Sequence, residues 1–215
     1  MDYFGFIIGA AILTYTFFFW LSRLREIQDN KKWVPTLDPD AQVSLPEKLP
    51  LISVLVPAHN EEKIIEFCIQ SILDQDYENF ELICIDDRST DQTAVLVKKL
   101  FEGRHNCRLL SIKKRQEGWT GKCHALNVGS KAAKGEWLAF IDADSSLHPR
   151  ALTQCLNETL KRRINLITLT PKFILGTFWE KALQPTLASM AAILFPLSQV
   201  NDPESPVATA NGMFF

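Results

Sequence analysis

The chain has 215 residues, and its 23 lysines and arginines nearly balance its 25 aspartates and glutamates, for a net charge of -2. Hydrophobic residues make up 47% and charged residues 22% of the chain, which is usual for a packed globular domain and excludes a disordered protein. The lack of a basic excess excludes a nucleic-acid binder that relies on neutralising phosphates. The five cysteines include no CxxC pair, so we expect no disulfide framework or zinc site and a reducing compartment.

The N-terminal segment is strongly apolar. From Tyr3 to Ser22, 20 consecutive residues carry no charge, and a helix of that length spans roughly 30 Å, the thickness of a membrane's hydrocarbon core. Four basic residues follow between positions 23 and 32, which favours a cytoplasmic location for the rest of the chain. A cleaved signal peptide is the alternative, but it requires positive charge before the apolar run and small residues after it. We therefore predict a single-pass plasma-membrane anchor over residues 1–25.

Residues 26–50 contain four prolines and no apolar periodicity, so we expect a linker there. The remaining residues, 51–215, suffice for one domain. Short apolar runs predict strands at 51–57, 80–85, 107–112, 137–141 and 166–169. Between them we expect a helix with an apolar stripe from 64 to 73 and further helices at about 92–101, 124–134 and 149–163. This alternation predicts an α/β domain with a mainly parallel sheet.

Acidic or polar clusters follow three of these strands, at 57–62, 86–91 and 142–144. In a parallel sheet, ligands bind beyond the carboxyl ends of the strands, so we expect the three clusters to converge on one edge. Asp142 and Asp144 would point the same way if the strand stays extended. Paired carboxylates with room for phosphate oxygens suit Mg²⁺ or Mn²⁺. The alternative for such a DxD sequence is a polar turn after a buried strand.

Three further groups of polar residues are candidates for parts of a site, and a site role is expected for the first two. Asp86 and Asp87 are expected to face the cleft, while Asp91 or a neighbour caps the following helix. Lys122 lies near a predicted helix start, where it could meet a phosphate or a base carbonyl, although its segment lacks the GxxxxGK[ST] pattern of a P-loop. The side chains of His59 and His124 are expected to be structural, because neither has a nucleophile partner in a suitable motif.

Four motifs occur in order along this part of the chain: VLVPAHNEE at 54–62, ICIDDRSTD at 83–91, GWTGKCHALNVG at 118–129 and FIDADS at 140–145. Through them, residues 51–215 resemble a family 2 glycosyltransferase of the GT-A type, whose fold is a mainly parallel sheet flanked by helices. The WTGK segment and the stretches FWEKALQP, FPLSQVNDP and ANGMFF are similar to bacterial hopanoid-associated glycosyltransferases, which are anchored in membranes.

The resemblance implies roles for individual residues. Eight of them would contact the nucleotide of the donor: Pro57, Ala58, Asn60, Glu61, Asp86, Asp87, Lys122 and Asp142. Of these, Asp87 with Asp86 would hold the uracil or other base edge. Asp142 with Asp144 would bind Mg²⁺ or Mn²⁺, which bridges the diphosphate of a nucleotide sugar. The family also implies inversion of the anomeric centre by direct displacement.

The resemblance further implies a carboxylate base that deprotonates the acceptor hydroxyl. Neither Glu180 nor Asp202 matches the position of that motif. Because the chain ends in the apolar run NGMFF at 211–215, a poor place for a domain to stop, we expect a C-terminally incomplete domain. No catalytic base is therefore assigned within the chain, and we expect it, with further membrane segments, beyond Phe215.

The stretch 173–200 includes 19 uncharged residues from Ala182 to Val200, with two prolines. The prolines and several polar residues disfavour a second membrane span. We favour a helix that lies in the plane of the membrane and guides a lipid acceptor to the cleft. An ordinary helix buried against the sheet is an equal alternative.

Together these features predict transfer of a sugar from a UDP-sugar to a lipid or lipid-linked acceptor at the cytoplasmic membrane face. A carotenoid- or sphingolipid-directed transferase of the same fold is one alternative. A non-catalytic, membrane-tethered nucleotide-sugar-binding fragment is another. A metal-dependent phosphohydrolase is the third, but it would normally place ligand histidines near the carboxylates of DADSS at 142–146.

Overall fold

The structure, a computed structural model, describes residues 3–30, 36–170, 174, 176–202, 204–207 and 209. The chain divides into two units. We call residues 37–172 with 210–215 the sheet unit, and residues 1–36 with 173–209 the helical unit. The basic residues at 31 and 32, on which the membrane orientation partly rests, lie outside the described residues, and so does the final run at 211–215.

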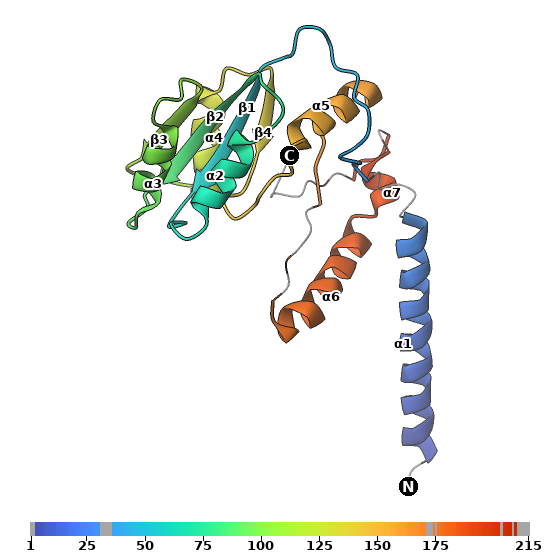
Figure 1. Ribbon diagram of the computed structural model, residues 1–215. Coiled ribbons are helices and arrows are strands. Elements are labelled where there is room, and N and C mark those ends of the chain that lie inside the picture. The colour runs from blue at the N-terminus through green and yellow to red at the C-terminus, as the bar shows by residue number, and fades with distance from the viewer. Residues whose placement is uncertain are drawn as a thin grey trace. The chain divides into compact units, whose positions relative to one another are not determined.

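The sheet unit is built on four parallel strands (Figure 1). These are β1 (Ile52–Ala58), β2 (Phe80–Asp87), β3 (Cys107–Ile112) and β4 (Trp137–Phe140). Their order is β3-β2-β1-β4, so both β2 and β4 pair in parallel with β1. The chain first builds outward from β1 to β3 and then returns to the other side of β1. This reversal of strand order is where α/β sheets bind ligands, and the α/β prediction is confirmed.

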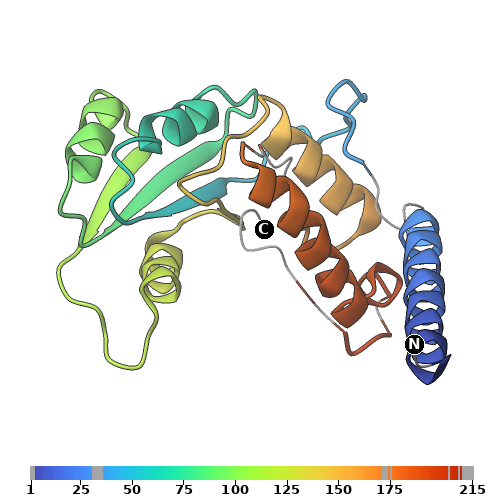
Figure 2. The same ribbon diagram turned by 90° about the horizontal axis from the view of Figure 1, so that it is seen from below.

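Helices cover both faces of the sheet, as Figure 2 shows. On one face, α2 (Ile65–Leu73), α3 (Thr93–Phe101) and α5 (Ala151–Arg162) share a core with the side chains of Val54, Val56 and Leu82. On the other face, α4 (Gly121–Ala132) packs on Leu55, Ile83 and Ile85. Even and odd positions of β1 and β2 therefore face opposite helices, as the twofold repeat of a strand requires.

The predicted strand at 166–169 is wrong, because the structure has no strand there. Ile167 and Leu169 are partly buried against the core, whereas Leu166 is exposed. Alternating apolar residues indicate that one side of a segment is buried. A strand also needs a neighbour for its backbone, and that pairing is not encoded in the segment itself.

Residues 37–50, expected to be part of a linker, contact the sheet unit. Leu37, Leu45 and Leu49 pack against the main core. The Asn157 side chain of α5 accepts a hydrogen bond of 3.0 Å from the backbone N–H of Ser44. Arg150 donates to the backbone oxygens of Pro39 and Ala41, and the Tyr77 hydroxyl donates to that of Pro50 at 2.6 Å. We call residues 37–50 the strap, because they tie the start of this unit to α5.

The helical unit contains α1 (Tyr3–Asn30), α6 (Phe178–Leu194) and α7 (Leu197–Val200). Among the helices the structure describes, α1 is long and apolar enough to cross a membrane, over Gly5–Ser22, by length and composition alone. Helix α6 starts with a capping box, in which Thr177 and Glu180 bond each other's backbone N–H groups. Glu180 therefore has a structural partner at the helix start.

Candidate functional site

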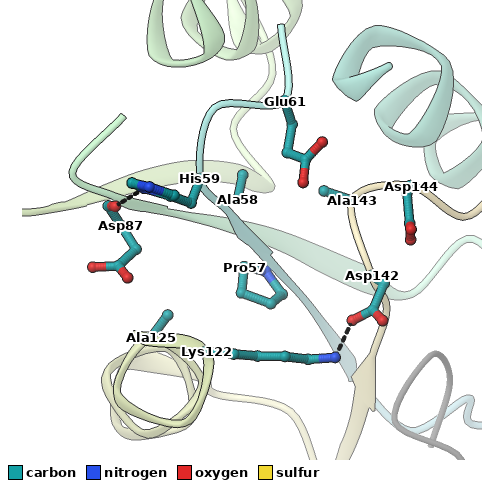
Figure 3. Close-up of a pocket in the computed structure, with 10 residues that line it drawn as sticks. All are labelled: Pro57, Ala58, His59, Glu61, Asp87, Lys122, Ala125, Asp142, Ala143 and Asp144. Atoms are coloured by element: carbon teal, nitrogen blue, oxygen red, sulfur yellow. Dashed lines mark hydrogen bonds and ion pairs between the residues drawn. The ribbon is translucent and has the colours of Figure 1, made fainter. Parts of the chain in front are cut away.

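A cavity of about 220 Å³ opens beyond the carboxyl ends of β1, β2 and β4 (Figure 3). Residues from four segments line it: Pro57, Ala58, His59, Glu61, Asp87, Lys122, Ala125, Asp142, Ala143 and Asp144. All three clusters expected to converge on one edge contribute to this lining, and the start of α4 adds Lys122. The cavity thus combines four carboxylates with an ammonium group.

Strand alternation separates Asp86 from Asp87 at the end of β2. Asp87 lies in the cavity, on the face of the sheet that carries α4. Asp86 is buried, accepts a hydrogen bond of 3.1 Å from the backbone N–H of Ser89, and is not part of the lining. The expectation that both carboxylates face the cleft is therefore met by Asp87 alone, because neighbouring strand residues point to opposite faces.

Asp87 is held ionised by its surroundings. Arg88, which has a positive φ of 62°, reaches back to both carboxylate oxygens, at 2.8 and 3.0 Å. These hydrogen bonds, together with the charges of Arg88, His59 and His124, lower the pKa of Asp87 against the opposing effect of burial. A carboxylate in this state accepts hydrogen bonds and donates none.

Helix α4 approaches Asp87 closely because its first residue is glycine. A Cβ atom on Gly121 would lie 2.6 Å from Oδ2 of Asp87. Farther along, a Cβ atom on Gly129 would lie 2.7 Å from Cδ1 of Ile85. The two glycines let the helix lie close to the sheet, and this position brings Lys122 and Ala125 to the cavity.

The loop after β1 is fixed by hydrogen bonds to the loop after β2. Asn60 adopts a positive φ of 58°, and its side-chain oxygen accepts a bond of 2.8 Å from the backbone N–H of Thr90. The backbone N–H of Glu61 donates to the Thr93 hydroxyl at 2.8 Å, and that of Glu62 to Asp91 at 3.1 Å. Asn60, predicted to contact the nucleotide, is not part of the cavity lining. Its hydrogen bonds shape the loop that presents Glu61.

Asp91 lies one residue before the N-cap position of α3, which is Gln92, and its carboxylate bonds the start of the helix as the sequence suggests. Its carboxylate accepts hydrogen bonds from the backbone N–H of Thr93, at 3.0 Å, and from the Thr93 hydroxyl, at 2.6 Å. Thr93 is the first residue of α3, so the carboxylate satisfies one of the N–H groups that a helix start leaves open.

Asp142 and Asp144 both line the cavity, although not by the expected route. Strand β4 ends at Phe140, and the chain then turns, with the backbone N–H of Ser145 donating to the backbone oxygen of Asp142 at 3.0 Å. The strand does not stay extended through Asp142 and Asp144. These residues instead form the polar turn that was the alternative prediction. The turn nevertheless leaves both carboxylates in the cavity (Figure 3).

The carboxylates of the cavity influence one another. Burial, followed by the negative charges of Asp144 and Asp91, raises the pKa of Glu61. The ammonium of Lys122 lies 2.6 Å from Oδ1 of Asp142. A bound cation would relieve the repulsion among these carboxylates.

The lining includes residues to which the sequence assigned no contact. His59 Nδ1 lies 2.6 Å from the backbone oxygen of Asp87, so this nitrogen carries the proton, because a carbonyl oxygen only accepts. Ala125 lies one helical turn after Gly121 and faces the same side. Ala143 lies between the two aspartates. All three residues lie inside the sequence motifs, and that position could have identified them as lining residues.

His124 is buried in the first turn of α4. Its ring centroid lies 6.1 Å from that of Trp119. Its Nδ1 atom is buried and has no hydrogen-bond partner. Among the described residues, no other buried side-chain nitrogen or oxygen lacks one. The structural role expected of His124 therefore leaves one of its ring nitrogens unsatisfied.

The donor atoms of the cavity fit a divalent cation that is shared with a ligand. Among the described residues, no group of three or more histidine, cysteine, aspartate or glutamate side chains could hold a metal ion by itself. Mg²⁺ is usually bound by one or two carboxylates together with phosphate oxygens of a substrate. The carboxylates of Asp142 and Asp144 provide this smaller set of hard oxygen ligands.

One solved structure similar to this chain is that of mannosyltransferase PcManGT from Pyrobaculum calidifontis in complex with GDP-Man and Mn²⁺. It matches with a TM-score of 0.54 and 25% identity, over 70% of this chain and 43% of that one. Its similarity supports the GT-A type of fold.

Curated proteins similar in sequence include the following two. An uncharacterized glycosyltransferase of Haemophilus influenzae is 32% identical over 116 residues, which cover 54% of this chain and 45% of that protein. The poly(ribitol-phosphate) beta-N-acetylglucosaminyltransferase TarS of Staphylococcus aureus is 28% identical over 171 residues, 76% of this chain and 29% of that protein. The chain thus spans less than half the length of each relative. The model of the family described as glycosyl transferase family 2 matches residues 53–206, and the chain belongs to that family.

Proposed function

We propose that this chain binds a UDP-sugar in the cavity and transfers the sugar, with inversion, to a lipid or lipid-linked acceptor at the cytoplasmic face of a membrane. The observation that carries the proposal is the meeting of three acidic strand ends and the start of α4 in one cavity. Family membership supports the reaction class.

The nucleoside would lie against the side of the cavity formed by β1 and β2. Pro57 and Ala58 provide a small apolar wall, and Glu61 provides an acceptor for ribose hydroxyls. Asp87 is ionised and offers its carboxylate to the N–H group of a base edge. The hydrogen bonds of Asn60 and Asp86 support a role in shaping the loops around the nucleotide.

The diphosphate would lie beside Lys122, Asp142 and Asp144, which line the same part of the cavity. Mg²⁺ or Mn²⁺ held by these aspartates would neutralise the negative charge that grows on the leaving diphosphate. Lys122, whose ammonium contacts Asp142, adds a second positive charge near the diphosphate. The similarity to a mannosyltransferase whose structure contains Mn²⁺ supports the use of a divalent cation.

The membrane part of the proposal rests on the helical unit. Helix α1 is apolar over Gly5–Ser22, and α6 carries a row of exposed apolar side chains. We call this row the α6 stripe; its members are Trp179, Leu183, Leu187, Met190 and Leu194. They recur every three or four residues and so share one face of the helix. Such a face can rest in the headgroup region of a membrane, where a lipid acceptor is available.

The test is calorimetric titration of the full chain in detergent with UDP in the presence of Mn²⁺. We expect Asp144→Asn to weaken metal-dependent binding of UDP by about 100-fold, because one of two carboxylate ligands is lost. Asp74→Asn is the matched control, since Asp74 lies at the end of α2, outside the cavity, and should bind as the unchanged chain does. Undiminished affinity of Asp144→Asn would contradict the metal assignment.

An assay with radiolabelled UDP-sugars and membrane lipid extracts tests the transfer step. Label in the lipid fraction, lost in Asp144→Asn and kept in Asp74→Asn, is the expected result. Binding of UDP without any transfer or donor hydrolysis would instead favour the alternative of a non-catalytic nucleotide-sugar-binding fragment.

A further inference from the structure

The cavity already contains a cation at the position of the proposed metal ligands. The ammonium of Lys122, in the first turn of α4, lies 2.6 Å from Oδ1 of Asp142. The Asp142 side chain is 22% exposed and that of Lys122 is 47% exposed. Figure 3 shows the lysine side chain extending past Pro57 to reach the aspartate.

The second cation near the cavity is engaged differently. Arg88 forms two hydrogen bonds to Asp87, its neighbour in the chain. Its planar guanidinium is matched to that carboxylate in a fixed geometry. Lys122, in contrast, is a single charge on a flexible stem, which can exchange one anion for another without movement of the backbone.

A divalent cation that uses Asp142 must compete with this ammonium. Before the donor binds, a metal ion at Asp142 would cost Lys122 its 2.6 Å contact with that carboxylate, and no phosphate oxygen would replace the contact. When a diphosphate is present, the same lysine gains phosphate oxygens as new partners. The free energy of metal binding therefore depends on whether the diphosphate is there.

We propose that Lys122 exchanges between Asp142 and the diphosphate of the donor, and that this exchange makes metal and donor bind cooperatively. The inference rests on the proposed function and adds a coupling to it. Because coupling between two ligands is reciprocal, the metal must raise the affinity for the nucleotide by the same factor as the nucleotide raises the affinity for the metal. Without donor, Lys122 acts as the counter-ion of Asp142 and disfavours the metal.

The test compares Mn²⁺ binding in the absence and presence of UDP, measured by electron paramagnetic resonance of free Mn²⁺ with the full chain in detergent. Lys122→Met keeps the length of the side chain and removes the charge. We expect it to bind Mn²⁺ alone about twofold to fivefold more tightly than the unchanged chain, the range for a partly exposed ion pair. We also expect UDP to increase its Mn²⁺ affinity by a smaller factor than it does in the unchanged chain.

Two further variants separate this effect from a general change in charge. Lys131→Met removes an exposed lysine from the last turn of the same helix and should leave both affinities unchanged. Lys122→Arg retains a cation and should not tighten the binding of Mn²⁺ alone.

The outcomes distinguish the inference from the proposed function. If Lys122→Met binds Mn²⁺ alone no more tightly than the unchanged chain, while the unchanged chain binds Mn²⁺ with UDP, the exchange is refuted and the function stands. An equal gain in Lys131→Met would also refute the exchange. If the unchanged chain binds no Mn²⁺ even with saturating UDP, the metal-dependent function fails, and the inference with it.

Discussion

Glu81 is a carboxylate buried near the start of β2, at the end of the sheet opposite the cavity. It accepts hydrogen bonds from the Ser53 hydroxyl at 2.5 Å, from the backbone N–H of Lys134 at 2.6 Å and from Arg108 at 2.8 Å. Arg108 also donates to the backbone oxygen of Ala132, the last residue of α4, at 2.7 Å. This network fixes the end of the helix whose start carries Lys122.

We predict that Glu81→Gln lowers the free energy of unfolding by about 2 kcal/mol at about pH 7, because the buried network loses its negative charge and one of its two acceptor oxygens. Burial alone would raise the pKa of Glu81, but hydrogen bonds from Ser53, Lys134 and Arg108 outweigh it and lower the pKa. Folding therefore gains stability from Glu81 above its usual pKa of 4.5. That gain is lost as the pH falls through the lowered value.

The measurement is urea-induced unfolding followed by near-ultraviolet circular dichroism, at about pH 7 and about pH 3.5. The deficit of Glu81→Gln should be largest at the higher pH and shrink at the lower one. Glu102→Gln, at the exposed end of α3, is the control and should match the unchanged chain. A deficit that stays constant with pH would contradict the ionised network.

The sequence predicts which residues line the cavity where the alternation of side chains along a strand is applied to each residue in turn. Asp87, Asp142 and Asp144 line the cavity as expected, because they lie at or just after the carboxyl ends of strands in one parallel sheet. The roles assigned to them stay predictions. Asp86 was placed in the cleft although alternation puts it on the other face from Asp87. Asn60 accepts a hydrogen bond from Thr90, which is 30 residues later in the chain. No local sequence pattern indicates this contact.

At the scale of elements, the strap has the composition of a linker but packs against the sheet unit. Its prolines and polar residues indicate a linker, yet Arg150 and Gln154 of the α5 region donate to backbone oxygens more than 100 residues earlier in the chain. Four strands and four helices of the sheet unit could be predicted because hydrophobic periodicity is local. The absent strand at 166–169 and the docked strap both depend on distant partners, which the sequence pattern does not specify.

We predict that a chain beginning at Leu37 is more stable than one beginning at Leu51, by about 3 kcal/mol in the free energy of unfolding. The longer chain keeps three partly buried leucines of the strap, each worth about 1 kcal/mol, together with the acceptor of the Tyr77 hydroxyl. Urea unfolding of the two chains, otherwise identical, provides the comparison. Equal midpoints would mean that the strap contributes nothing to stability and acts only as a linker.

At the scale of the whole molecule, the chain combines a sheet unit that holds a polar cavity with a helical unit whose described helices expose apolar side chains. An enzyme that passes a water-soluble donor's sugar to a lipid needs both kinds of surface. In the proposed function, the cavity keeps charge in contact with water, and the apolar helices would attach the chain to a bilayer. The two proposed attachments would differ in strength, because α1 is long and apolar enough to cross a bilayer, whereas the α6 stripe would only lie on it.

We predict that deleting residues 1–25 changes the mode of membrane attachment. The full chain should remain in membranes washed with alkaline carbonate, whereas the shortened chain should be released by that wash and still float with anionic lipid vesicles at low salt. Adding Leu183→Glu and Leu187→Glu to the shortened chain should abolish flotation, because two charges then interrupt the α6 stripe. Gln184→Glu, on the same helix but outside the stripe, is the matched control and should leave flotation intact. If the shortened chain never floats, or floats equally well with both glutamates in the stripe, α1 is the sole attachment and the in-plane role of α6 is wrong.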